Sequence, residues 1–215
     1  MTENSFNAQY DITKKSKLKK FYESNKILIF SFIFILLIFF GSFSFYLESK
    51  KKKRIILSEN FVQAKIYLEN GNKSDAINIL KNLIYANDTT YSNLSLFLIL
   101  DQNLITNFDE LSVLFDHLLT NKNFEKEVRN LLIYKRALLY SNFVSESELL
   151  EKIKPLLNAE TLWKPHALLL MGDYFVSKKE YHKAKVFYVQ ILSIKNLQRN
   201  LYNEAKTQLN LISNE

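Results

Sequence analysis

Residues 64–84, AKIYLENGNKSDAINILKNLI, and residues 171–194, MGDYFVSKKEYHKAKVFYVQILSI, share one spacing of small and large residues. The spacing is counted from Ala64 in the first stretch and from Gly172 in the second. An aromatic residue follows three positions later, an alanine twelve and a large residue sixteen: Tyr67, Ala76 and Leu80, and then Phe175, Ala184 and Tyr188. Small residues let the backbones of two antiparallel helices approach, and the aromatic fills the space beside the contact. The spacing therefore predicts two helical hairpins of the same construction.

Weaker copies of this spacing lie between the two stretches and after them. The positions from which it is counted, here called the reference residues, are Ala64, Ile99, Ala137, Gly172 and Ala205. They are 35, 38, 35 and 33 residues apart, which brackets the 34-residue period of tetratricopeptide repeats (TPRs). After Ile99 and Ala137 the alanine at the twelfth position is missing, so we expect these two repeats to be degenerate. We predict an all-α, TPR-like α-solenoid of about four helical hairpins with a capping helix, over residues 55–86, 91–119, 125–157, 165–194 and 197–212.

The N-terminal part of the chain has a different character. Residues 27–47, ILIFSFIFILLIFFGSFSFYL, form one uncharged and mostly apolar run of 21 residues. At about 1.5 Å per residue, a helix of this length extends about 31 Å, which matches the hydrocarbon core of a bilayer. We predict a disordered cytoplasmic tail over residues 1–17, a transmembrane helix with basic flanks over residues 18–54, and the TPR-like repeat domain over residues 55–215.

A cleaved signal peptide is the alternative to a permanent membrane anchor, because a basic region before an apolar run is common to both. The apolar run here exceeds the roughly 7 to 15 residues of a signal peptide's hydrophobic region. The sequence that follows, SFYLESKKKK, also lacks the small residues of a cleavage site. The sequence therefore favours an uncleaved anchor.

Lysines flank both ends of the apolar run. Six precede it, and a basic block follows it: Lys14, Lys15, Lys17, Lys19, Lys20 and Lys26, and then Lys50, Lys51, Lys52, Lys53 and Arg54. Cytoplasmic flanks usually carry the excess of positive charge, so counting alone does not decide the orientation. Short tails follow this rule better than long domains, and we therefore expect a cytoplasmic N-terminus. The basic block is expected to attract anionic lipid headgroups.

Composition excludes several functional classes for the domain after the anchor. The chain's formal charge is +7, but residues 55–215 contain 18 Lys and Arg against 18 Asp and Glu. A neutral domain lacks the basic face of a nucleic-acid-binding protein. The chain has no cysteine, only three glycines, and three histidines without metal-binding spacing: His117, His166 and His182. We expect no enzyme activity, and no catalytic residues, metal, cofactor or small-molecule substrate.

The function class that the composition leaves open is the binding of other proteins. In helical repeats, the first helix of each hairpin lines a groove that accepts an extended segment or a helix of a partner. Projection onto helices directs six residues of the third and fourth hairpins toward this groove: Tyr134, Leu138, Ser141, Leu169, Asp173 and Val176. These are the predicted protein-binding residues.

Polar residues before the predicted helices are expected to cap their first turns. Serine and threonine accept hydrogen bonds from free backbone N–H groups at such positions. The expected caps are Ser74, Thr106, Ser145 and Ser177, and Pro165 is expected near the start of a helix.

The whole arrangement resembles the YfgM-like ancillary SecYEG translocon subunit family. The resemblance rests on the basic tail, the single N-terminal anchor, the two stretches quoted above with Gly172 and Ala184, and the length of 215 residues. It implies a single-pass protein of the bacterial inner membrane with its TPR-like domain in the periplasm. It also implies a non-enzymatic adaptor that contacts the Sec translocon and either exported polypeptides or periplasmic chaperones.

A different class of function fits the same sequence. The domain could serve as a cell-envelope scaffold for outer-membrane assembly or division, with no link to protein export. A helical repeat domain provides a binding surface without specifying what binds there. The two hypotheses therefore differ in their partners and not in their fold.

Overall fold

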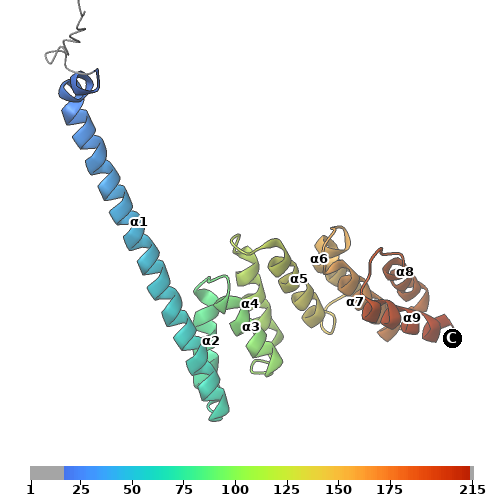
Figure 1. Ribbon diagram of the computed structural model, residues 1–215. Helices are drawn as coiled ribbons and strands as arrows, with labels where there is room; N and C mark the ends of the chain where they lie inside the picture. The colour runs from blue at the N-terminus through green and yellow to red at the C-terminus, as the bar shows by residue number, and fades with distance from the viewer. Residues whose placement is uncertain (1–16, 214–215) are drawn as a thin grey trace, which may run out of the picture. The chain divides into compact units, whose positions relative to one another are not determined.

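The structure is a computed structural model that describes residues 17–213 of the chain. All regular secondary structure in this part is helical, as predicted, and it contains no strand. The helices are α1 (Lys17–Glu69), α2 (Lys73–Tyr85), α3 (Tyr91–Asp101), α4 (Phe108–Thr120), α5 (Lys126–Tyr140), α6 (Glu146–Leu157), α7 (Lys164–Ser177), α8 (Tyr181–Leu192) and α9 (Arg199–Ser213) (Figure 1). Apart from Lys17, the predicted disordered tail lies outside the described residues, so it stays a prediction.

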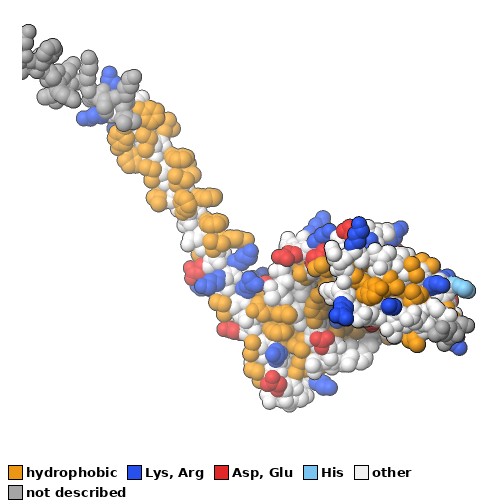
Figure 2. Space-filling model, turned by 45° about the vertical axis from the view of Figure 1, so that its right-hand side comes forward, with side chains coloured by type: hydrophobic (Ala, Val, Ile, Leu, Met, Phe, Trp, Pro, Cys, Tyr) orange, Lys and Arg blue, Asp and Glu red, His pale blue; other side chains and the backbone are white. Residues whose placement is uncertain are grey.

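Contacts divide the chain into two compact units, Met1–Ile56 and Leu57–Glu215. In the first unit, apolar side chains surround α1, and basic side chains lie near both ends of the apolar segment (Figure 2). Most side chains of this segment are exposed; Ile27, for example, is 77% exposed. Among the described residues, this is the one helix that is long and apolar enough to be a candidate membrane span. A local departure from helical geometry occurs at Asn25, whose amide donates a hydrogen bond to the Phe21 carbonyl at 3.1 Å.

The second unit has one continuous apolar core. All five reference residues are buried in it, and four of them, Ala64, Ile99, Ala137 and Ala205, have no exposed surface. The residues twelve and sixteen positions after the first four reference residues are buried as well: Ala76, Leu80, Leu111, Phe115, Leu149, Ile153, Ala184 and Tyr188. Burying a large apolar side chain contributes roughly 1.5–3 kcal/mol, so these positions contribute much of the domain's stability.

Helices that follow one another in the chain pack together in the second unit. Contacts join α2 to α3, and then each helix from α3 to α9 to the next (Figure 1). Alternate helices also meet: α2 contacts α4, and α7 contacts both α5 and α9. The corresponding contact between α3 and α5 does not occur in the described residues. The first helices of the last two predicted hairpins therefore contact each other and α7 contacts the closing helix, whereas in this described part the first helices of the second and third hairpins do not meet.

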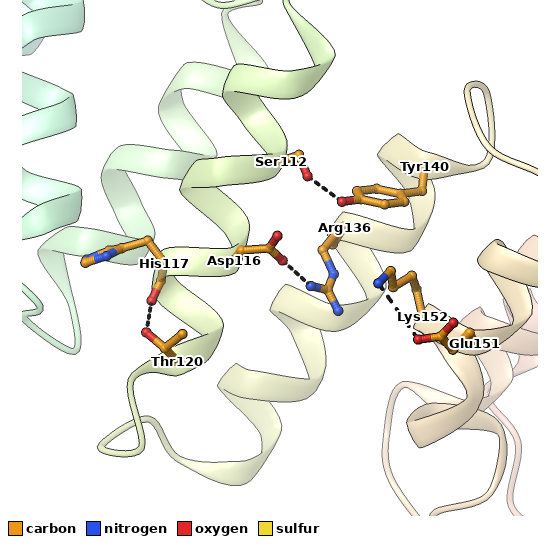
Figure 3. A network of polar contacts seen from close by, with 8 residues as sticks. All are labelled: Ser112, Asp116, His117, Thr120, Arg136, Tyr140, Glu151 and Lys152. Carbon is orange, nitrogen blue, oxygen red and sulfur yellow. Dashed lines mark hydrogen bonds and ion pairs between the residues drawn. The ribbon is translucent and has the colours of Figure 1, made fainter.

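A polar junction joins α4 to α5 (Figure 3). A guanidinium nitrogen of Arg136 lies 2.5 Å from a carboxylate oxygen of Asp116, and the hydroxyls of Ser112 and Tyr140 share a hydrogen bond. Arg136 also lies over the Tyr140 ring, 6.0 Å from its centroid. This junction falls between the two degenerate repeats. Side-chain polar contacts therefore contribute to the packing there, where the spacing lacks its second small residue.

The helix ends agree closely with the predicted boundaries, but two of the predicted caps are displaced. Ser145 caps α6, as predicted, by accepting a hydrogen bond from the Glu148 N–H at 3.4 Å. The caps of α2 and α4 are Asn72 and Asn107 instead of Ser74 and Thr106. Each asparagine lies one turn before the N–H that it accepts, and Asn caps as well as Ser does. The prediction for Ser177 was also wrong, because it is the last residue of α7. Pro165 does lie in the first turn of that helix.

Helices α1, α3 and α7 end in the same kind of turn, and two of these turns lie at the same distance from a reference residue. After α1, the Asn72 N–H donates to the Tyr67 carbonyl at 2.8 Å, and Gly71 has a φ of +79°. After α7, the Glu180 N–H donates to the Phe175 carbonyl at 2.9 Å, and Lys179 has a φ of +59°. This backbone pattern satisfies carbonyls at the end of a helix and requires one left-handed residue. That residue lies seven positions after Ala64 in one case and after Gly172 in the other.

Candidate protein-binding surface

The six predicted protein-binding residues lie on α5 and α7, two helices in contact with each other. Tyr134 and Leu138 are one turn apart on α5, and Ser141 follows at its C-terminal cap. Leu169, Asp173 and Val176 are spaced by one turn each on α7. Residues three and four apart share a helix face. We call these six residues the α5/α7 surface.

The members of this surface differ in how available they are to a partner. Leu138 is 41% exposed, so it can contact another protein. Leu169 and Val176 are partly buried and pack against the core, so they also stabilise the fold. The Ser141 hydroxyl donates to the Leu138 carbonyl at 2.8 Å and is satisfied locally. The residues most available for contact with a partner are thus Leu138, Tyr134 and Asp173.

Aromatic rings gather around Tyr134. The centroid of the Tyr134 ring lies 5.5 Å from that of Trp163 in a stacked geometry and 5.7 Å from that of His166. The Trp163 and His166 rings are themselves 5.3 Å apart. All three side chains are partly buried, so each keeps some surface in water. Sequence analysis did not place Trp163 or His166 here. A usable signal was the chain's only tryptophan standing just before a helix that starts with proline.

Asp173 is held by a tyrosine from the next helix. The Tyr188 hydroxyl donates to Asp173 Oδ1 at 2.7 Å, although Tyr188 has no exposed surface. Its ring lies over the backbone of Gly172, where an added Cβ would be 2.8 Å from ring atom Cζ. Carbon atoms do not approach so closely without displacement. Gly172 thus allows Tyr188 to lie where its hydroxyl can reach the α5/α7 surface.

Negative charge converges on the same region. Burial raises the pKa of Asp173, and the nearby carboxylate of Glu204 on α9 raises it further, against the effect of the Tyr188 hydrogen bond. Burial also raises the pKa of Tyr134, with Asp173 and Glu204 adding to the effect. The pKa of His166 is lowered by burial, and Glu204 partly opposes this. Glu204 therefore acts on groups from both α5 and α7, which makes the region locally anionic.

The basic block predicted to lie beside the membrane belongs to α1. The side chains of Lys50, Lys51, Lys52, Lys53 and Arg54 are exposed. Lys52 forms an ion pair with Glu48 at 2.9 Å. Exposed cations on a helix can approach anionic headgroups, so their role at the lipid surface stays a prediction.

Two cavities of the domain are lined by residues other than the six of the α5/α7 surface. One of about 590 Å³ is formed by the start of α8 and the end of α9, and is lined by Tyr181, His182, Lys183 and Ile212 among others. Another of about 500 Å³ lies at the loops before α7 and α9 and includes Leu162, which is 75% exposed. Within residues 17–213, no group of three or more His, Cys, Asp or Glu residues could hold a metal ion.

Comparisons with protein families, with curated proteins and with solved structures gave no match. The function is therefore inferred from the residues and their contacts.

Proposed function

We propose that this protein is a non-enzymatic, membrane-anchored adaptor whose TPR-like domain binds other proteins through the α5/α7 surface. The observation that carries the proposal is the location of this surface on two first helices of predicted hairpins. These two helices are in contact, and they carry an exposed leucine, an aromatic ring that stacks on Trp163, and an exposed carboxylate held by Tyr188. Aromatic residues are enriched at protein–protein contacts, where they supply large area at low entropic cost.

The apolar part of α1 supports the membrane anchor. Its side chains are exposed on every side within their own unit, and leaving this surface in water would be unfavourable by roughly 25 cal/mol per Å². A helix that is apolar all round is stable inside a bilayer. The proposed topology is a single pass with a cytoplasmic N-terminus and the domain on the opposite side.

The burial of the reference residues supports the TPR-like arrangement. Small residues at Ala64, Ala137 and Gly172 are buried where the repeat spacing requires close helix contacts. The helices that contain Ala64 and Gly172 end in the same turn, at the same distance from their reference residue. Repetition of both the packing and the turn is what a tandem repeat produces.

The resemblance to the YfgM-like family suggests where the adaptor acts. In that account the protein lies in the bacterial inner membrane, its domain is periplasmic, and it contacts the Sec translocon with exported polypeptides or periplasmic chaperones. A scaffold for outer-membrane assembly or division would use the same surface with another partner.

One experiment separates these accounts. The tagged full-length protein is purified from its own membranes in a mild detergent, and its partners are identified by mass spectrometry. The controls are the anchor alone, residues 1–56, and the full chain carrying Leu138→Asp. We expect translocon subunits to be recovered with the full chain and lost in both controls. Recovery of another envelope complex would contradict the export function, and recovery by the anchor alone would contradict the role of the domain.

The absence of cysteine allows a clean test of topology. A single Lys206→Cys variant has no competing thiol in the chain. We expect a membrane-impermeant maleimide to label it in cells whose outer membrane is permeabilised. Labelling only after the inner membrane is broken would place the domain in the cytoplasm.

A further inference from the structure

Tyr188 is the residue by which the last repeat differs from the first in its polar contacts. In the first stretch, the residue sixteen positions after the reference residue is Leu80, which is fully buried and has no polar group. In the last stretch it is Tyr188, which is equally buried but donates a hydrogen bond to Asp173. Tyr188 occupies one Asp173 oxygen, Oδ1, and no hydrogen bond from the described residues involves Oδ2. The Tyr188 hydrogen bond thus holds the Asp173 carboxylate in position, and Oδ2 can still accept a hydrogen bond from a partner.

Within the described part of the chain, no ion pair compensates the charge of Asp173. Among residues 17–213, neither Asp173 nor Glu204 forms an ion pair, although acidic residues elsewhere do: Glu110 with Lys81, Asp116 with Arg136, and Glu146 with Lys183. The α5/α7 surface itself contains no lysine or arginine. Beyond the effect of burial, the Glu204 carboxylate raises the pKa of Asp173, so the two negative charges repel one another and an added cation would be favourable there.

The two carboxylates act on two members of an aromatic cluster, because in addition to burial both raise the pKa of Tyr134 and Glu204 acts on that of His166. Tyr134, Trp163 and His166 lie within 5.7 Å of one another, measured between ring centroids, and keep some surface in water. The faces of aromatic rings attract lysine and arginine side chains, and carboxylates accept charge-assisted hydrogen bonds from the same side chains. Lysine and arginine combine a charged end with an apolar stem, and exposed Leu138 offers contact to such a stem.

We propose that Tyr134, His166, Asp173 and Glu204, here called the anionic patch, bind a lysine or arginine side chain of a partner protein segment. The inference rests on the proposed function and names the chemistry of the partner. Charge complementarity selects a basic segment, because an acidic one would meet two uncompensated carboxylates. Tyr188 is a positioning residue in this account, since it holds Asp173 without facing the partner.

The test uses the full-length protein in an uncharged detergent and measures fluorescence anisotropy of labelled peptides. The probe is a short peptide of alternating Lys and Ala, and the comparison peptides replace Lys with Glu or with Gln. Because the chain carries a net charge of +7, general electrostatic attraction would favour the Glu peptide. We expect only the Lys peptide to bind, and added salt to weaken its binding.

Variants assign the binding to the patch. Asp173→Asn/Glu204→Gln is expected to weaken binding about tenfold, because two charge-assisted contacts are lost. Tyr188→Phe keeps the ring over Gly172 and is expected to weaken binding about threefold, as one hydrogen bond to the carboxylate disappears. The matched control, Asp101→Asn/Glu125→Gln, changes the net charge equally at exposed positions on α3 and before α5. It should bind like the wild type.

Three outcomes would overturn the inference: equal binding of the Glu peptide, unchanged binding by Asp173→Asn/Glu204→Gln, or an equal loss in the matched control. The far-UV circular dichroism of each variant shows whether it is folded, and both double variants are close to isosteric. If the purification described above recovers partners through the domain while the Lys peptide does not bind, the inference fails and the proposed function stands. If the peptide binds and no partner depends on the domain, the proposed function fails instead.

Discussion

The repeats counted from Ala64 and from Gly172 have the same spacing but pack with different pairs of residues. Ala64 is paired in the spacing with Leu80, whereas Gly172 is paired with Tyr188, and all four are buried. Gly172 lacks the methyl group that Ala64 has, and Tyr188 has an aromatic ring and a hydroxyl where Leu80 has an aliphatic side chain. The ring fills the space above Gly172, and the hydroxyl reaches Asp173. The same repeat spacing can therefore be packed by a buried residue that also positions a surface carboxylate.

The largest difference between the two repeats should appear when the partner side chain is removed. We expect Tyr188→Ala to lower the free energy of unfolding by about 4 kcal/mol and Leu80→Ala by about 3 kcal/mol, because both leave cavities. Urea denaturation of the full-length protein in detergent, followed by far-UV circular dichroism, measures both values. A loss below about 1 kcal/mol for Tyr188→Ala would contradict the buried position of its ring.

Replacing both Gly172 and Tyr188 by the residues of the first repeat should cost less stability than replacing Gly172 alone. Gly172→Ala places a Cβ against the Tyr188 ring and is expected to cost about 2 kcal/mol, as overpacked cores do. Adding Tyr188→Leu recreates the Ala and Leu pair of the first repeat and should recover part of this loss. The same urea denaturation applied to the two single variants and the double variant gives the coupling between the positions. Additive losses would show that residues 172 and 188 do not share one packing site.

The turns that end α1 and α7 give opposite predictions for glycine. Gly71 is already the favourable residue at its left-handed position, so Gly71→Ala should destabilise the domain by about 1 kcal/mol. Lys179 occupies the same position with a side chain, and Lys179→Gly should stabilise by about 0.5 kcal/mol, after the entropic cost of glycine. Thermal unfolding of both variants tests this difference in sign. Equal signs would show that the turns are not equivalent.

The smallest expected effect concerns pH. Burial, together with Glu204, raises the pKa of Asp173 in the folded protein above its value of about 3.9 in an unfolded chain. The folded state then holds this proton more tightly, so the stabilisation is fully present below about pH 3.9 and is lost as the pH rises through the raised pKa. Relative to Asp173→Asn, the wild type should lose free energy of unfolding over that range. A relative gain with rising pH would mean that the folded protein favours the ionised carboxylate.

Much of the fold could be predicted from the sequence because packing leaves a periodic trace. The spacing from Ala64 and Gly172 located helices whose ends agree closely with the structure, since small residues at helix contacts recur with the repeat. The caps were predicted less well. Asn72 and Asn107 took the places expected for Ser74 and Thr106, because several residue types accept the same hydrogen bond.

The candidate surface was harder to predict than the fold. Helix projection directed Tyr134 and Asp173 toward one groove, and the structure places them on two helices in contact, α5 and α7. The roles of Tyr188 and Glu204 could not be predicted in this way. The repeat spacing identifies Tyr188 only as a large residue, whose ring is buried, and only the structure shows its hydroxyl reaching Asp173. Glu204 comes from a helix 31 residues farther along the chain than Asp173, and sequence spacing does not say which faces meet.

Site-specific photocrosslinking in native membranes tests most directly whether the α5/α7 surface is where partners bind. A photoreactive amino acid replaces Leu138, which is 41% exposed on α5, or Val113, which is 58% exposed on α4 and lies outside this surface. Both variants replace one exposed apolar residue, so non-specific crosslinking should be similar for the two positions. The account predicts one discrete set of protein adducts from position 138, reduced by Asp173→Asn/Glu204→Gln, and none of these from position 113. The same adducts from both positions, or adducts from position 113 alone, would contradict it.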